Sequence, residues 1–102
     1  MRLTDEEVIV KYDKANEVGA ARMFKALGHP ARAWIVKELV NGEHRVSDFV
    51  EAIGVEFATV SRHLAKLKSA KLVVSHKRGR EIWYGLNKPE IARLTGDITA
   101  KD

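Results

Sequence analysis

The stretch VEFATVSRHLAKLKSAK, residues 55–71, decides the fold of this chain. Val60, Leu64 and Leu67 recur at i, i+4 and i+7, which predicts a helix that buries one apolar stripe. The side chains outside the stripe can reach phosphates or base edges, and they are Thr59, Ser61, Arg62, His63 and Lys66. The stretch therefore predicts an amphipathic helix whose polar face suits a nucleic acid.

Positive charge is concentrated around the same stretch. The 102 residues carry 18 Lys/Arg and 14 Asp/Glu, a formal net charge of +4. Residues 1–50 hold eight of each sign, whereas residues 51–102 hold ten basic and six acidic residues. Seven basic residues and no acidic residue occur from Arg62 to Arg80. A solvated face usually interleaves the two signs, so this run favours a surface that binds a polyanion.

Length and composition restrict the class of protein. The length suits a single domain over residues 1–102, and 45% hydrophobic with 31% charged residues is typical of a folded protein. No apolar run approaches the roughly 18 residues that span a bilayer. Acidic residues stand where a signal peptide would have its apolar core, so we expect no membrane association and a cytoplasmic location. The absence of cysteine excludes disulfides and thiolate ligands.

Capping and turn residues divide the chain into five or six helices. Thr4 followed by Glu7 is a capping box, which predicts a first helix over about residues 5–17. A last helix is expected over about residues 89–100. The boundaries of the helices between them are marked by Gly28, Pro30, Asn41-Gly42, Ser47 and Gly54. The helix that ends at Gly54 and the helix of residues 55–71 form a helix-turn-helix pattern.

The apolar period changes from 3.6 to 2 after Lys71. Residues 72–76 and 81–86 are rich in β-branched and aromatic residues, which predicts two antiparallel strands joined by the turn Lys77-Arg78-Gly79-Arg80. Such a hairpin with a basic tip is a wing, and its Lys77, Arg78 and Arg80 suit a minor groove or a phosphate backbone. The expected fold is mainly α with a small β wing (α+β), a winged helix-turn-helix with a two-stranded hairpin.

The terminal helices carry more apolar residues than a small core needs. We expect the helix over about residues 5–17 and the helix over about residues 89–100 to form a two-fold dimer interface. A dimer would place two copies of residues 55–71 in successive major grooves of duplex DNA. The apolar residues predicted for this interface are Val8, Tyr12, Ile91, Leu94 and Ile98.

Four stretches in this order resemble the ArsR (ArsR/SmtB, arsenic-repressor) family of winged helix-turn-helix transcriptional regulators: MFKALGHPARAWIVKELVNGE, VSDFVEAIGV, TVSRHLAKLKSAKLV and RGREIWYGLN. Together they cover about residues 22–87. The resemblance implies a homodimer that binds a pseudo-palindromic operator as a repressor and leaves it when an effector binds. The DNA-binding residues are then expected to be Phe57, Ala58, Thr59, Ser61, Arg62, His63, Lys66, Lys77, Arg78 and Arg80.

The chain departs from the family pattern at the metal-sensing positions. Arg45 and Ser47 stand where the family has two cysteines, and the C-terminal segment has Asp97 but no histidine. A tetrahedral zinc site needs three or four ligands, so we expect no metal and no cofactor. The effector, which is an unidentified small molecule if one exists, would not be sensed through cysteine thiolates.

A second departure lies at the start of the DNA-reading helix. The family commonly has Ser-Gln-Ser or Ser-Pro-Ser there, and this chain has Glu56-Phe57-Ala58. Phe57 cannot make the paired hydrogen bonds by which glutamine reads adenine, although a phenyl ring can contact a thymine methyl group. The operator preference of the family therefore does not transfer to this chain.

Other functions have weaker support in the sequence. A winged-helix module could instead bind a protein through its terminal helices. Trp83 and Tyr84 are expected to fill the core rather than a ligand pocket. Ser61, His63 and Asp48 invite a catalytic triad, but no nucleophile elbow accompanies them, so we expect no enzyme. A metal sensor built across a dimer would draw on Glu43, His44, Asp48, His29 and His76.

Overall fold

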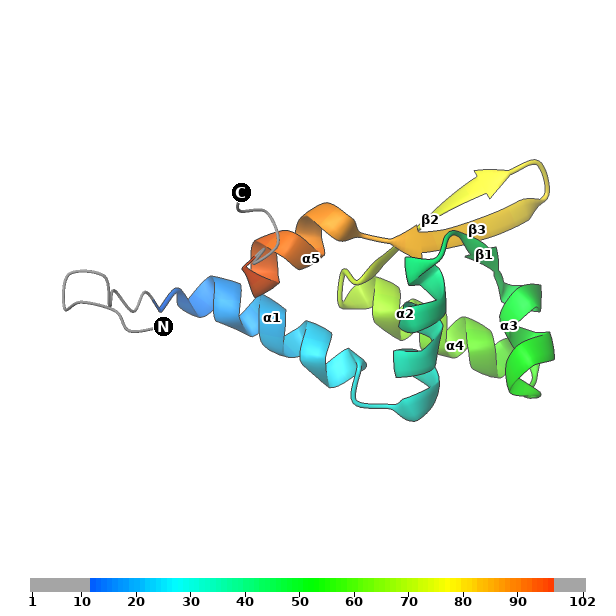
Figure 1. Ribbon diagram of the computed structural model, residues 1–102, viewed down its shortest axis with the longest axis horizontal. Helices are drawn as coiled ribbons and strands as arrows, with labels where there is room; N and C mark the ends of the chain where they lie inside the picture. Colours follow the sequence, from blue (N-terminus) through cyan, green and yellow to red (C-terminus); the bar gives the residue numbers. More distant parts are fainter. Residues whose placement is uncertain (1–11, 97–102) are drawn as a thin grey trace.

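The computed structural model describes residues 12–96. Its elements, in chain order, are α1 (Lys14–Ala26), α2 (Pro30–Val40), β1 (His44–Arg45), α3 (Val46–Ile53), α4 (Phe57–Ser69), β2 (Val73–Arg78), β3 (Glu81–Leu86) and α5 (Lys88–Thr95). Helices α2, α3 and α4 form a compact group from which the hairpin of β2 and β3 projects, while α1 and α5 lie together at the other end (Figure 1). This arrangement confirms the predicted winged helix-turn-helix.

Helix α4 is held by the apolar stripe that predicted it. Val60, Leu64 and Leu67 are all fully buried in one core shared by the helices and the sheet. Helix α3 ends at Gly54, whose φ of 76° is a left-handed conformation that glycine adopts without strain. The short connection after Gly54 turns the chain into α4, as the helix-turn-helix pattern predicted.

The N-terminal part of the fold differs from the prediction. A single helix, α1, runs from Lys14 to Ala26, and Asp13 caps it by accepting a hydrogen bond from the Asn16 backbone N–H at 3.3 Å. Tyr12 and Asp13 are not helical. The predicted helix over about residues 5–17 is therefore wrong at these two residues. The Thr4 capping box and Val8 lie outside the described residues.

The C-terminal helix α5 covers Lys88–Thr95 and packs within its own chain, and residues 97–100 of the predicted helix lie outside the described residues. Helix α5 starts after Asn87, whose side chain accepts from the Glu90 backbone N–H, and it ends at Gly96, where φ is 70°. Leu94 is only 6% exposed and lies against α1, so close that a Cβ added at Gly19 would be 2.9 Å from a Leu94 methyl. The expected exposure of Leu94 is therefore wrong, and Ile98 lies outside the described residues.

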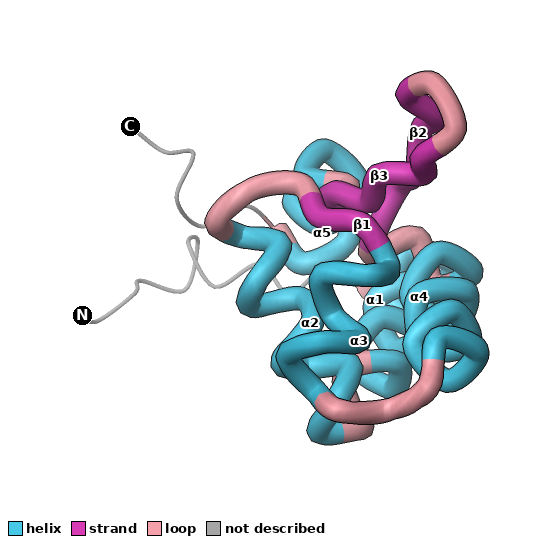
Figure 2. The backbone as a smooth tube through the Cα atoms, turned by 90° about the vertical axis from the view of Figure 1, so that its right-hand side faces the viewer, coloured by secondary structure: helices cyan, strands magenta, loops and turns pink. Residues whose placement is uncertain are grey.

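The sheet has three strands in the order β1-β3-β2, not the two predicted. Strand β1 pairs antiparallel with β3, with Arg45 opposite Trp83, and Figure 2 shows it along the edge of the hairpin. The hairpin has Arg78 opposite Glu81, which leaves Gly79 and Arg80 as a two-residue turn. Gly79 has a φ of 63°, as this type of tight turn requires. The wing is therefore anchored to the α2–α3 connection as well as to α4.

Replacement of Leu64 by alanine should lower the free energy of unfolding by about 3 kcal/mol, because the side chain is fully buried in α4. Urea denaturation followed by circular dichroism measures this change. Val40→Ala is the control, since Val40 is 63% exposed and its truncation should cost less than about 0.5 kcal/mol. Equal stability of the two variants would contradict the packing of α4 described here.

Candidate nucleic-acid interface

Helix α4 presents a row of exposed side chains on the face opposite its buried stripe. Ala58, Arg62 and Lys66 follow one another at i, i+4 and i+8, and all three are exposed. We call these three residues the outer row. Because both its basic side chains extend from one rigid helix, the outer row is a surface that can follow a groove of duplex DNA.

Two further predicted residues, Phe57 and Ser61, lie beside the outer row on the side of the wing. Phe57 is the first residue of α4 and is 60% exposed, and Ser61 is half-buried one turn later. On the other side of the outer row, Thr59 is half-buried one turn before His63. The structure thus brings five of the predicted residues onto one side of α4 and leaves Thr59 and His63 nearer the protein interior.

His63 packs against α2 instead of facing outward. Its ring centroid lies 4.5 Å from that of His29, which caps α2 by accepting from the Ala31 backbone N–H. The Arg32 Nη1 atom is 3.5 Å from the His63 Nδ1 atom. Burial lowers the pKa of His63 from its ordinary value of 6.5, and the charges of His29 and Arg32 lower it further. The ring of His63 thus joins α4 to α2, and a contact of His63 with DNA stays a prediction.

The wing, residues 73–86, carries two kinds of basic residue. Lys77 and Arg80 are exposed, and among residues 12–96 no carboxylate lies within 4 Å of either one. Arg78 is also exposed, but its Nη2 atom donates to the Glu43 carboxylate at 2.6 Å. Glu43 therefore already balances the charge of Arg78, whereas Lys77 and Arg80 keep theirs for a partner.

Trp83 is the centre of an ionic cluster on the outer face of the sheet. The guanidinium carbons of Arg45 and Arg78 lie 5.2 and 5.0 Å from its ring centroid, a cation–π distance. Glu43 accepts from Arg78, and it also lies 3.4 Å from His76. Trp83 thus packs outside the core, contrary to the prediction, because its strand position faces away from the helices. Tyr84, its neighbour, packs against the core as expected.

Arg45, at one of the two family cysteine positions, connects α3 to the wing. Its side chain forms ion pairs with Asp48 at 3.1 Å and with Glu81 at 2.7 Å. Hydrogen bonds from the backbone and side chain of Arg45 lower the pKa of Asp48, and the two carboxylates raise the pKa of Arg45. Ser47, at the second position, is exposed. Arg45 therefore makes an ionic connection between α3 and the wing at the first of these positions.

The residues weighed for a metal site do not form one in the described part of the chain. Among residues 12–96, no three His, Asp or Glu side chains come together closely enough to hold an ion. Glu43 and His76 do meet, but Arg78 shares the carboxylate. The His44 ring packs on Phe49, with 5.4 Å between centroids.

No helix within residues 12–96 is long and apolar enough to cross a membrane.

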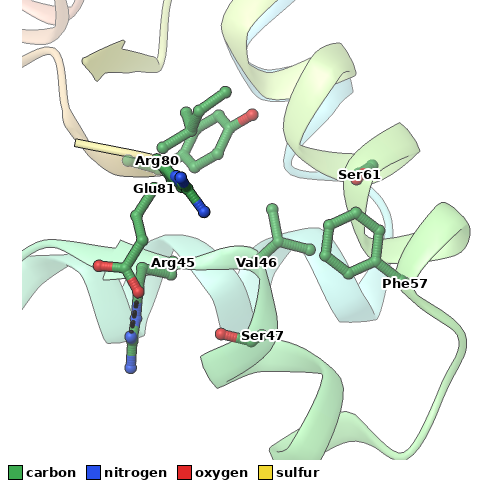
Figure 3. Close-up of a pocket in the computed structure, with 9 residues that line it drawn as sticks. Arg45, Val46, Ser47, Phe57, Ser61, Arg80 and Glu81 are labelled. Carbon is green, nitrogen blue, oxygen red and sulfur yellow. Dashed lines mark hydrogen bonds and ion pairs between the residues drawn. The ribbon is translucent and has the colours of Figure 1, made fainter. Parts of the chain in front are cut away.

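A groove separates the start of α4 from the wing. It has a volume of about 340 Å³, and Figure 3 shows Phe57 and Ser61 on the α4 side with Val46 and Ser47 from α3 beside them. Strand β3 lines the opposite side with Glu81, Ile82 and Tyr84. Arg80 of the turn and Arg45 complete the lining. Sequence analysis did not single out Ile82 or Val46 as site residues. The period of two in β3, which places Ile82 on the same face as Tyr84, is the signal that could have found Ile82.

The fold and this surface define a winged helix-turn-helix protein with a basic face. The family model for bacterial regulatory proteins of the arsR family matches residues 29–75. The HTH-type transcriptional regulator NmtR of Mycobacterium tuberculosis is 40% identical over 74 residues, which is 72% of this chain and 62% of NmtR. The biofilm growth-associated repressor of Xylella fastidiosa is 35% identical over 85 residues, 83% of this chain and 73% of that repressor.

A solved structure agrees with these relatives. The homodimeric winged helix-turn-helix DNA-binding domain Mb0332 of Mycobacterium bovis has a TM-score of 0.70 and 31% identity, and the match covers 85% of this chain and 82% of that one. The chain therefore belongs to the ArsR family of transcriptional regulators, as the resemblance predicted. It spans less than two thirds of the length of NmtR.

His63→Gln should reduce the pH dependence of stability. The lowered pKa of His63 means that the unfolded chain binds this proton more readily than the folded protein does. The free energy of unfolding therefore falls as the pH drops below the ordinary value of 6.5, and the variant loses this contribution. Urea unfolding at about pH 7 and about pH 5 measures the difference. Lys37→Gln is the control, and a wild-type pH dependence in His63→Gln would contradict the half-buried position of His63 beside His29 and Arg32.

Proposed function

We propose that this chain is a dimeric, sequence-specific DNA-binding transcriptional repressor. The observation that carries the proposal is the set of exposed cations on the outer row and on the wing. Arg62, Lys66, Lys77 and Arg80 are all exposed, and none has a carboxylate within 4 Å among residues 12–96. The sequence between Glu56 and Glu81 contains no acidic residue. Such a surface has the charge that a phosphate backbone requires.

Each part of this surface has its own role in the proposal. The N-terminal half of α4, with Phe57, Ala58 and Ser61, enters a major groove and meets base edges, since the first turns of a recognition helix are the part that reaches them. Arg62 reads guanine or holds a phosphate, and Lys66 holds a phosphate. The wing places Lys77 and Arg80 on the neighbouring backbone or minor groove, while Arg78 contributes less because Glu43 neutralises it. Thr59 reaches the backbone from the inner edge of α4.

The names of similar proteins support repression and dimer formation. The Xylella relative is named as a repressor, as is the SdpR protein of Bacillus subtilis, which is 34% identical over 65 residues. The Mb0332 domain is described as a homodimer that binds DNA. Within this chain, Arg45 and Ser47 fill the cysteine positions, so we propose that an effector, if one acts, is not sensed through thiolates there.

A dimer would form through α1 and α5 in this proposal. Helix α1 exposes 42% of Val18 and 62% of Phe24, and Tyr12 before it is 75% exposed. Ile91 is half-buried on α5, which packs on α1. Leu94 contributes indirectly, because it fixes α5 on α1 within one chain. A two-fold axis at this layer would present two copies of α4 to successive major grooves, about 34 Å apart.

Replacement of Arg62 or Arg80 by alanine should weaken binding to a duplex selected by the wild-type protein from a random pool. The plot of log affinity against log salt concentration should become shallower by about one for each phosphate contact removed in each subunit. Arg78→Ala should change the slope less, because Glu43 already pairs with Arg78. Fluorescence anisotropy at several salt concentrations measures the slopes, with Lys37→Ala as the control. Unchanged slopes in both Arg62→Ala and Arg80→Ala, or no duplex binding by the wild type, would refute the proposal.

Phe24→Ser should convert the dimer into a monomer at micromolar concentration. The change removes an exposed phenyl ring from the α1 face, where the proposed interface would bury it. Phe57→Ser is the matched control, since Phe57 is equally exposed (60%) but lies on α4, and it should remain dimeric. Light scattering coupled to gel filtration gives the mass of each species. A monomeric wild-type protein under these conditions would exclude the dimer.

A further inference from the structure

An exposed aromatic ring occupies the first position of α4. Phe57 is 60% exposed and follows Glu56 directly, at the end of α4 that the proposed function places nearest the bases. The ring carries no hydrogen-bond donor or acceptor. It is also too exposed to be explained by the hydrophobic core, which the structure completes with other side chains. The ring is therefore free to contact a partner outside the chain, at the end of α4 that the proposed function places nearest the bases.

The surroundings of Phe57 restrict the partner. The ring is one wall of the groove between α4 and the wing, and in Figure 3 it lies beside Val46 and below Ser61. Ile82, which is 48% exposed, lines the groove from β3. Arg80 stands at the turn of the wing, and among residues 12–96 it has no carboxylate within 4 Å. Arg45 and Glu81 also line the groove, but they pair with each other at 2.7 Å, so the groove combines an apolar part with one cation, Arg80, that lacks such a pair.

Duplex DNA supplies matching chemistry for both features. The only apolar group that a base pair presents in the major groove is the 5-methyl group of thymine. The donors and acceptors on the base edges need polar partners, which a phenyl ring cannot supply. A phosphate of the same strand carries the negative charge that can pair with Arg80.

We propose that Phe57 and the apolar part of this groove form a contact site for a thymine methyl group, and that Arg80 binds the DNA phosphate backbone beside it. Phe57 is then a specificity-determining residue that selects thymine over cytosine and over uracil at one position of each half-site. This inference rests on the proposed function, because it assigns a base to a surface that must first bind DNA.

The test removes one methyl group from the DNA and one ring from the protein. Each thymine of a duplex selected by the full wild-type chain is replaced in turn by deoxyuridine, which lacks only the 5-methyl group. At one position per half-site the wild type should lose about fourfold in affinity, the effect expected for one buried methyl or methylene group. Phe57→Ala should bind the thymine duplex about that much more weakly and should not distinguish thymine from uracil at this position. Phe57→Leu should keep part of the discrimination, because leucine retains an apolar contact.

Two controls make the outcomes decisive. Val40→Ala, an exposed change on α2, should discriminate as the wild type does, and circular dichroism establishes that each Phe57 variant is folded. Wild-type binding that no deoxyuridine replacement weakens would overturn this inference alone, as would a folded Phe57→Ala protein that remains as sensitive to uracil as the wild type. No duplex binding by the wild type would overturn the proposed function itself.

Discussion

Burial of one apolar stripe on α4 is the constraint on which the rest of the structure depends. Val60, Leu64 and Leu67 are completely removed from water, and each contributes on the order of 2 kcal/mol of burial free energy. This burial fixes the rotation of α4 about its axis. The direction in which each of the remaining side chains of the helix points follows from that rotation. The outer row faces solvent, Phe57 and Ser61 face the wing, and His63 faces α2. A rotation by one residue, about 100°, would turn Ser61, Ala65 and Lys68 inward in place of the stripe.

The wing depends on a second, ionic constraint. The Trp83 ring brings the guanidiniums of Arg45 and Arg78 together, and Glu81 and Glu43 balance their charges. These pairs are partly exposed, so each contributes modestly to stability. Their larger effect is geometric, because they tie the wing to the start of α3 on one side and to the α2–β1 connection on the other. Arg45 and Glu81, which form one of these pairs, also line the groove beside α4.

Sequence patterns predicted the parts of the fold that depend on local periodicity and not those that depend on contacts. The stripe of α4 and the alternation in the hairpin were sufficient for the helix-turn-helix and the wing. Strand β1 is only two residues long, too short for a period of two to appear, so it was missed. Helical spacing placed Leu94 on the apolar face of the last helix. It could not show that Gly19 leaves room for the Leu94 side chain within the same chain. Likewise, polarity alone could not show that the His63 ring packs on His29.

The central claim is that the outer row of α4 and the wing form the DNA-binding surface. Backbone amide chemical shifts of the full chain, recorded by NMR before and after addition of a selected duplex, test it most directly. The largest changes should fall on residues 57–66 of α4 and on residues 77–80 of the wing. Changes confined to α1 and α5, or no change on addition of DNA, would contradict the account and favour a surface for another protein.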